Sequence, residues 1–274
     1  GSLSARIPSA LSTLFLMIMI ADTIFCSTEN SQDKIKLSLI ASLSFVLSPL
    51  IIIWSRTAVS DSLLCAALGI CLLSFWRRIS SEEDQICITP WFFLATAILT
   101  KGPFAFFIVF VTLLSFLLTH KNWKKLFLKL NPFKGILLTF LVSSPWYLIQ
   151  LSFNGKVFWD SFFGYHNLQR YTSVVNNHSE PWWFYLFILI LASLPFSVFL
   201  IHGIVDTFKE LIIKFKKRSE NINSIYLFSL CWLISILLFF SFSATKLPSY
   251  WIPAIPAASI LISRSAKILS IKKR

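Results

Sequence analysis

Long apolar runs recur along the whole chain and are separated by short polar segments. Runs of roughly 15 to 22 residues approach the length that an α-helix needs to cross a bilayer. Leu, Ile and Phe dominate them without the period-two alternation of outer-membrane β-strands. The runs lie at about 7–26, 37–54, 62–76, 88–100, 104–119, 135–151, 182–203, 225–243 and 248–263. The sequence therefore predicts an all-α integral membrane protein with nine transmembrane helices.

Composition agrees with lipid as the solvent of this chain. Of its 274 residues, 56% are hydrophobic and 14% are charged, which is too apolar for a soluble globule. The net charge of +13 could suggest nucleic acid as a partner, but no polar stretch is long enough for a basic, water-facing domain. We expect one membrane domain over 1–274, no soluble domain, and free cysteines without a metal cluster.

The basic residues predict an orientation. Nine crossings place 19 of the 25 Lys and Arg residues on one side, in clusters at 34–36, 77–78, 121–134, 209–218 and 264–274. Short cytoplasmic loops collect such charges, so we expect the N-terminus outside and the C-terminus inside. The clusters could also bind anionic lipid, although ordinary topology charges are the simpler interpretation. The outer side then holds one sizeable loop, at about 152–181.

Two helix mouths on the outer side carry compact polar motifs. Ser55–Asp61 contains Arg56 and Asp61. Arg56 alone could be a snorkelling anchor, but Asp61 has no stem with which to snorkel, which favours an ion pair or a function. In Thr100-Lys101-Gly102-Pro103, Gly-Pro explains a tight turn, and Lys101 is free to serve as a point charge for a phosphate.

The outer loop and the segment before the last run complete the polar set. His166 and Arg170 are four residues apart, so a helical turn would place them on one face with Asn167 and Tyr171 nearby. The Trp and Tyr residues near 182 could simply form an interfacial belt. Lys246 and Tyr250 lie in a segment whose prolines indicate a bent or partly re-entrant chain. Together the motifs predict an electropositive pocket for an anionic headgroup, most simply a phosphate.

These motifs resemble those of the protein-mannosyltransferase-like superfamily of membrane glycosyltransferases, and within it the bacterial aminoarabinose transferase branch. The resemblance covers nearly the whole chain in the order of the family. It rests on 5–11, 55–61, 100–103, 163–170 with His178 and Pro181-Trp182-Trp183, and 245–250.

The resemblance implies a C-type glycosyltransferase fold in the bacterial inner membrane, with a polyprenyl-phosphate sugar as donor and a lipid or protein as acceptor at the periplasmic face. It implies inverting displacement, in which cations stabilise the departing lipid phosphate and a carboxylate assists the acceptor. The carboxylate would be Asp61, and His166 could additionally hold a divalent metal. The cations would be Lys101, His166, Arg170 and Lys246, and the substrate pocket would include Arg56, Asn167, Tyr171, His178 and Tyr250.

One departure from the family pattern leaves alternatives open. The best-known acidic pair of the family would precede the position matched by Arg6-Ile7-Pro8. The chain is therefore expected to be either a piece of a longer enzyme or a catalytically dead remnant that still binds a lipid phosphate. The rival from another class is a transporter or flippase for lipid-linked sugars, which should place ionisable residues near the bilayer midplane.

Overall fold

The computed structural model describes residues 2–82, 87–174, 180–216 and 224–272, and every regular element among them is helical. This confirms the all-α fold class. The helices are α1 (Ser2–Ser27), α2 (Ser31–Val46), α3 (Pro49–Trp54), α4 (Asp61–Ser80), α5 (Thr89–Lys101), α6 (Phe104–Leu117), α7 (Trp123–Lys129), α8 (Pro132–Phe158), the π-helix η1 (Trp159–Gln169), α9 (Arg170–Thr172), α10 (Phe184–Ala192), α11 (Ser197–Lys216), α12 (Ile225–Ser241), the 3-10 helix η2 (Pro248–Ala254) and α13 (Ile255–Lys272).

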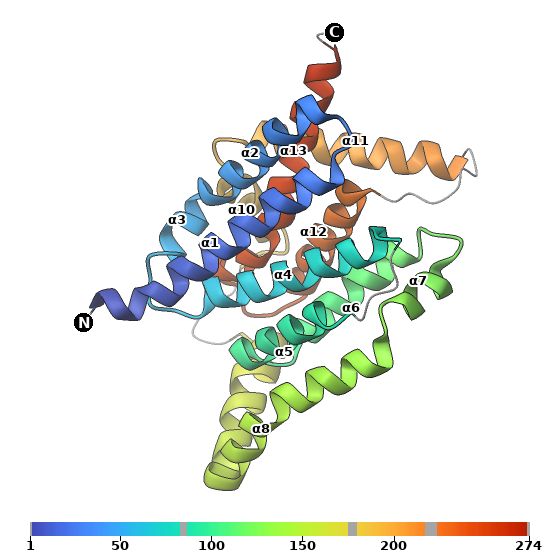
Figure 1. Ribbon diagram of the computed structural model, residues 1–274. Helices are drawn as coiled ribbons and strands as arrows, with labels where there is room; N and C mark the ends of the chain where they lie inside the picture. Colours follow the sequence, from blue (N-terminus) through green and yellow to red (C-terminus); the bar gives the residue numbers. More distant parts are fainter. Residues whose placement is uncertain (1, 83–86, 175–179, 217–223, 273–274) are drawn as a thin grey trace.

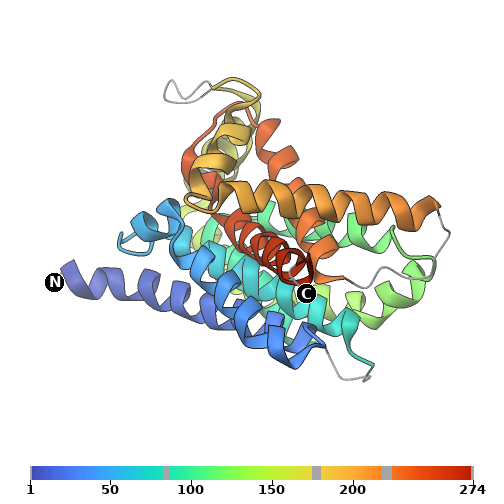
Figure 2. The ribbon, with the colours of Figure 1, turned by 90° about the horizontal axis from the view of Figure 1, so that it is seen from above.

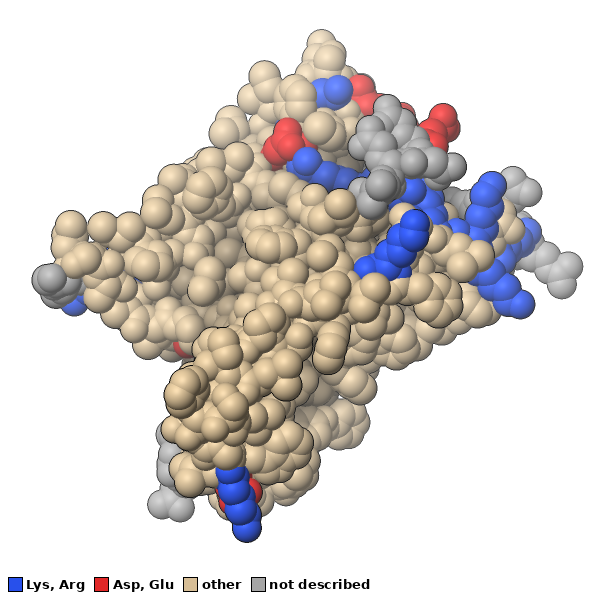
Figure 3. All heavy atoms as spheres, turned by 60° about the horizontal axis from the view of Figure 1, so that its bottom comes forward, with Lys and Arg blue, Asp and Glu red and all other residues tan. Residues whose placement is uncertain are grey.

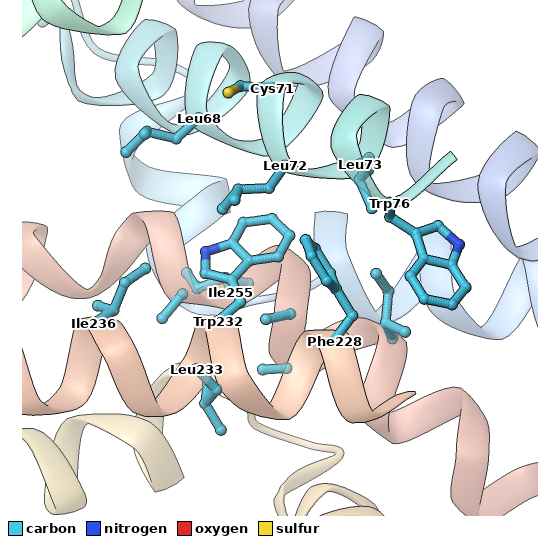
Figure 4. Close-up of a cluster of buried hydrophobic side chains, with 14 of the residues drawn as sticks. Leu68, Cys71, Leu72, Leu73, Trp76, Phe228, Trp232, Leu233, Ile236 and Ile255 are labelled. Carbon is cyan, nitrogen blue, oxygen red and sulfur yellow. The ribbon is translucent and has the colours of Figure 1, made fainter. Parts of the chain in front are cut away.

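Helix α4 lies at the centre of the bundle, against α1 on one side and α5 on the other (Figure 1; Figure 2). Leu68 and Leu72 of α4 are fully buried and face Phe228 and Trp232 of α12 (Figure 4). Side chains of this size bury enough apolar area to contribute about 2 kcal/mol each. Because α4 is fixed in the core, its first residue, Asp61, has a fixed position.

Within the part of the chain that the structure describes, three helices are long and apolar enough to cross a membrane, namely Leu3–Ser27, Asp61–Ser80 and the helix that runs on from Pro132 to Thr172. Among the described residues, the shorter helices α6 and α12 are also apolar. The predicted span 182–203 is not one straight helix, because α10 and α11 meet at 115° across a short break. The span predicted at 37–54 is likewise divided, between α2 and α3 at Ser48-Pro49.

Helix α8 leaves the bundle and carries η1 at its far end (Figure 1). Within the bundle its main neighbour is α5. Three contacts fasten the two helices: Gly135 sits directly against the ring of Trp91, the hydroxyl of Thr139 donates to the Trp91 carbonyl at 3.0 Å, and the hydroxyl of Tyr147 donates to the Ile98 carbonyl at 2.8 Å. These contacts hold the first half of α8 against α5.

The end of the bundle opposite Asp61 holds several cations. Arg78 at the C-terminal end of α4 donates to the Lys129 carbonyl, and the ammonium of Lys129 in turn donates to the Ser81 carbonyl. Figure 3 shows a face that is almost free of charge over most of its area, with Lys and Arg gathered toward one end. The loop that carries α7 therefore lies far along α4 from Asp61.

Candidate active site

A cavity of about 650 Å³ opens where α4, α5, α9, α12 and η2 meet. Five of the residues predicted from sequence line it, namely Asp61, Lys101, Arg170, Tyr171 and Tyr250. They come from four segments that are far apart in the chain. The rest of the lining is mainly apolar and aromatic: Leu64, Thr100, Pro103, Phe104, Phe162, Phe163, Leu168, Phe239, Phe240, Ser243, Ser249 and Pro253.

Asp61 and Lys101 form an ion pair that joins the N-terminal end of α4 to the C-terminal end of α5. The Lys101 ammonium donates to Oδ1 of Asp61 at 2.6 Å, and both side chains are mostly buried. Asp61 occupies the first turn of α4, where the helix dipole favours a carboxylate, and Lys101 is the last residue of α5, where the dipole favours a cation. Sequence reasoning placed both residues at helix mouths, and the structure shows that they neutralise one another.

Arg170 approaches the cavity from the outer loop. Its guanidinium lies 6.0 Å from the ring centre of Tyr165, and its Nε is buried without a hydrogen-bond partner among the described residues. The following residue, Tyr171, packs against Phe239 with ring centres 5.1 Å apart. Because the charges of Asp61 and Lys101 cancel, Arg170 gives the cavity lining a net positive charge.

Backbone hydrogen bonds join the segment that contains Lys246 to the helical turn that contains Arg170. The backbone N–H of Ala244 donates to the Tyr171 carbonyl at 2.9 Å, and that of Thr245 donates to the Arg170 carbonyl at 3.1 Å. Lys246 itself does not line the cavity but lies between Ser243 and Ser249, which do. It is buried, at 8% exposure, and forms no ion pair or hydrogen bond with any residue that the structure describes.

The remaining predicted residues fall in three places. Arg56 is exposed in the turn between α3 and α4 and does not line the cavity, so its place in the substrate pocket stays a prediction. His166 and Asn167 lie in η1, but their side chains are outside the described residues, as is the whole of His178. No group of His, Cys, Asp and Glu among the described residues could hold a metal ion, and the metal suggested for His166 stays untested.

The aromatic wall of the cavity was missed from sequence. Five phenylalanine rings form this wall, because all five line the cavity: Phe162 and Phe163 of η1, Phe104 of α6, and Phe239 and Phe240 of α12. The signal was present in the density of Phe residues, but hydropathy does not distinguish rings that face lipid from rings that face a cavity. A cavity lined by apolar rings and by cationic side chains fits an amphiphile with an anionic headgroup better than a free sugar.

Known proteins resemble this chain in sequence and in fold. Residues 1–149 match the family described as dolichyl-phosphate-mannose-protein mannosyltransferase. The chain belongs to this family. One relative is the undecaprenyl phosphate-alpha-4-amino-4-deoxy-L-arabinose arabinosyl transferase of Erwinia tasmaniensis. It is 30% identical to this chain, and the match covers 75% of the chain and 36% of that protein. The protein of the same name from an Enterobacter species is 26% identical over 97% of the chain and 46% of its own length.

A solved structure shares the fold. ArnT from Cupriavidus metallidurans bound to undecaprenyl phosphate superposes with a TM-score of 0.78 at 23% identity, covering 97% of this chain and 46% of that one. Its apo structure gives a TM-score of 0.79 at 20% identity, with 98% and 46% covered. This establishes the C-type glycosyltransferase fold expected from sequence. This chain spans less than half the length of the relatives that it matches.

Proposed function

We propose that this chain forms the donor-phosphate site of a membrane glycosyltransferase that moves a sugar from a polyprenyl-phosphate donor to a lipid or protein acceptor. The observation that carries the proposal is the cavity that the Asp61–Lys101 pair and Arg170 line together with an aromatic wall. The cations suit the phosphate of the donor, and the wall suits the first units of its polyprenyl chain. The relatives' name specifies an undecaprenyl-phosphate-linked amino sugar, which supports this class of donor.

The chemistry follows from where charge develops. When an acceptor hydroxyl attacks the anomeric carbon, the bond from that carbon to the phosphate oxygen breaks, and the departing lipid phosphate gains negative charge. Lys101 and Arg170 are held in place before the reaction and stabilise that charge without having to reorganise. Oδ1 of Asp61 is taken by Lys101, so Oδ2 is the atom available to accept the proton of the hydroxyl.

We further propose nine crossings of the bacterial inner membrane, with the cavity at the periplasmic face. The bias of 19 of 25 basic residues to one side supports this orientation. The position of Arg78 and Lys129 at the end of α4 opposite to Asp61 supports it as well. The bent pair α10–α11 would count as one broken crossing in this arrangement.

A transporter should place ionisable residues near the bilayer midplane, and the predicted span at 7–26 contains one acidic residue, Asp22. Asp22, the charged residue inside a predicted span, lies near the end of α1 and pairs with Arg77 near the end of α4 at 2.7 Å. The Arg77 guanidinium also donates to the Thr23 hydroxyl. A pair fixed at helix ends and already neutralised is a structural tie rather than a midplane coupling site.

The test compares charge-removing variants inside and outside the cavity. Membranes containing Lys101→Ala or Arg170→Ala are given a panel of labelled polyprenyl-phosphate sugars, and transfer is measured together with binding of undecaprenyl phosphate in nanodiscs. Each variant should bind at least tenfold more weakly, because a charge-assisted contact to the phosphate is lost. Lys125→Ala, an exposed residue of α7, is the matched control. Wild-type levels of binding and transfer in both cavity variants would refute the assignment.

A further inference from the structure

Tyr185 lies outside the cavity lining, yet it contacts the segment that carries Lys246. Its ring is fully buried and stacks on Trp251 with ring centres 6.0 Å apart. Its hydroxyl donates to the carbonyl of Leu247 at 3.1 Å and accepts from the backbone N–H of the same residue at 3.2 Å. One side chain thus satisfies both backbone polar groups of the residue next to Lys246.

The segment from Ser243 to Leu247 is therefore held at both ends. At its start, Ala244 and Thr245 bond to the backbone of the α9 turn, and the hydroxyl of Thr245 donates to the Ser173 carbonyl at 3.0 Å. At its end, Tyr185 bonds Leu247. Lys246 is the residue between these two attachments, and the first attachment also fixes it relative to Arg170.

The energetics of Lys246 indicate why such a clamp would be needed. A lysine side chain that is mostly buried loses part of its hydration, and a flexible segment would regain that hydration by turning the side chain toward water. Here the segment is fastened on both sides and the lysine stays buried. A cation kept in this state is preorganised for an anion that arrives from outside the chain.

We infer that Tyr185 is a positioning residue that clamps Leu247 and so holds Lys246 beside Arg170 as a preformed pair of cations for the lipid phosphate. The inference rests on the proposed function, since it names the phosphate as the anion. Tyr185 acts only through the backbone of Leu247 and touches no substrate. Tyr185→Phe keeps the ring stacked on Trp251 and removes only the hydroxyl, so it tests the clamp with little change in packing.

The experiment is a double-mutant cycle on binding of undecaprenyl phosphate to the full chain in nanodiscs. Lys246→Gln should weaken binding about tenfold or more, as expected for a lost charge-assisted contact, and Tyr185→Phe should weaken it by roughly five- to tenfold. In the Lys246→Gln background, Tyr185→Phe should have no further effect. Tyr226→Phe is the matched control, because Tyr226 is a buried tyrosine of α12 whose ring lies 5.1 Å from the Arg264 guanidinium, far from this clamp.

The outcomes separate the two proposals. Equal factors for Tyr185→Phe with and without Lys246 would overturn the clamp, since a general loss of structure acts independently of the lysine. A wild-type chain that binds undecaprenyl phosphate no better than undecaprenol would overturn the proposed function. In that case the clamp is still tested by acylation of the Lys246 amine, followed by mass spectrometry. The clamp requires Tyr185→Phe to raise the acylation rate severalfold, and an unchanged rate would overturn it.

Discussion

Replacing Gly135 by alanine should loosen the seat of α8 on α5. A Cβ added to Gly135 would lie 2.0 Å from Cε2 of Trp91 and 2.2 Å from its Nε1, far inside ordinary contact distance. Trp91 is confined, because its Nε1 donates to the Leu130 carbonyl at 2.9 Å and its ring meets Phe75 edge-on at 5.0 Å. Either the indole leaves its site or α8 moves away from α5.

The loss in free energy of unfolding follows from the contacts that the Trp91 indole would lose. Breaking the bond to Leu130 and leaving a buried Nε1 unsatisfied costs about 1–3 kcal/mol, and losing the contact with Phe75 adds about 0.5–1.5 kcal/mol. The overpacked methyl itself adds about 1–3 kcal/mol, which brings the total to roughly 2.5–7.5 kcal/mol. For a chain of this size, each kcal/mol lowers Tm by about 2–4 °C, so Gly135→Ala should lower Tm by roughly 5–30 °C.

The chain supplies its own probe for this measurement. Cys65, Cys71 and Cys87 are buried free thiols, so a thiol-reactive dye reports unfolding in detergent without any added label. Gly164→Ala is the matched control, because the nearest atom to an added Cβ there is 3.9 Å away, and its Tm should change by no more than about 1 °C. A Gly135→Ala variant that melts with the wild type would show that α8 is not seated on Trp91.

Two further substitutions test other parts of the molecule. Asp61→Asn removes the negative charge beside Lys101, which would otherwise repel a bound phosphate. Two unit charges roughly 4 Å apart interact by about 4 kcal/mol at an effective dielectric constant of about 20. Even after screening, the variant should bind undecaprenyl phosphate about tenfold more tightly, and weaker binding would contradict this electrostatic argument. Gly203→Ala would place a methyl 2.1 Å from the Leu261 carbonyl oxygen, backbone against backbone, and should lower Tm at least as much as Gly135→Ala if α11 packs on α13 as observed.

The site residues could be predicted to lie near one another because each motif stands at a helix end on the same side of the predicted bilayer. Counting crossings was enough to place Asp61, Lys101, Arg170 and Tyr250 on one side, and the cavity contains all four. The pairing of Asp61 with Lys101 was beyond that reasoning, because it depends on how α4 and α5 are rotated about their axes. Hydropathy carries no information on rotation.

Two features were missed for different reasons. The break between α10 and α11 lies inside an uninterrupted apolar run, so hydropathy predicts a straight span, although Pro195 was an available signal for a break. Tyr185 belongs to the aromatic residues near 182, which the sequence leaves open as a simple interfacial belt, and its role depends on the backbone of Leu247, 62 residues later. A contact of that kind leaves no pattern within either segment.

The two sides of the cavity differ in how firmly the fold holds them. Asp61 belongs to α4, which is mostly buried within the bundle. Arg170 follows the arm formed by α8 and η1, which is mostly exposed beyond its contacts with α5, and the backbone pairing with Ala244 and Thr245 ties Arg170 to the bundle. Local stability follows buried contact, so the arm is the side that can open with least cost. Because Tyr185 clamps Leu247 to the bundle, an opening that displaces Arg170 leaves Lys246 in place, together with the Asp61–Lys101 pair. A lipid phosphate bound to both Arg170 and Lys246 would therefore hold the arm against the core and complete the aromatic wall around the polyprenyl chain.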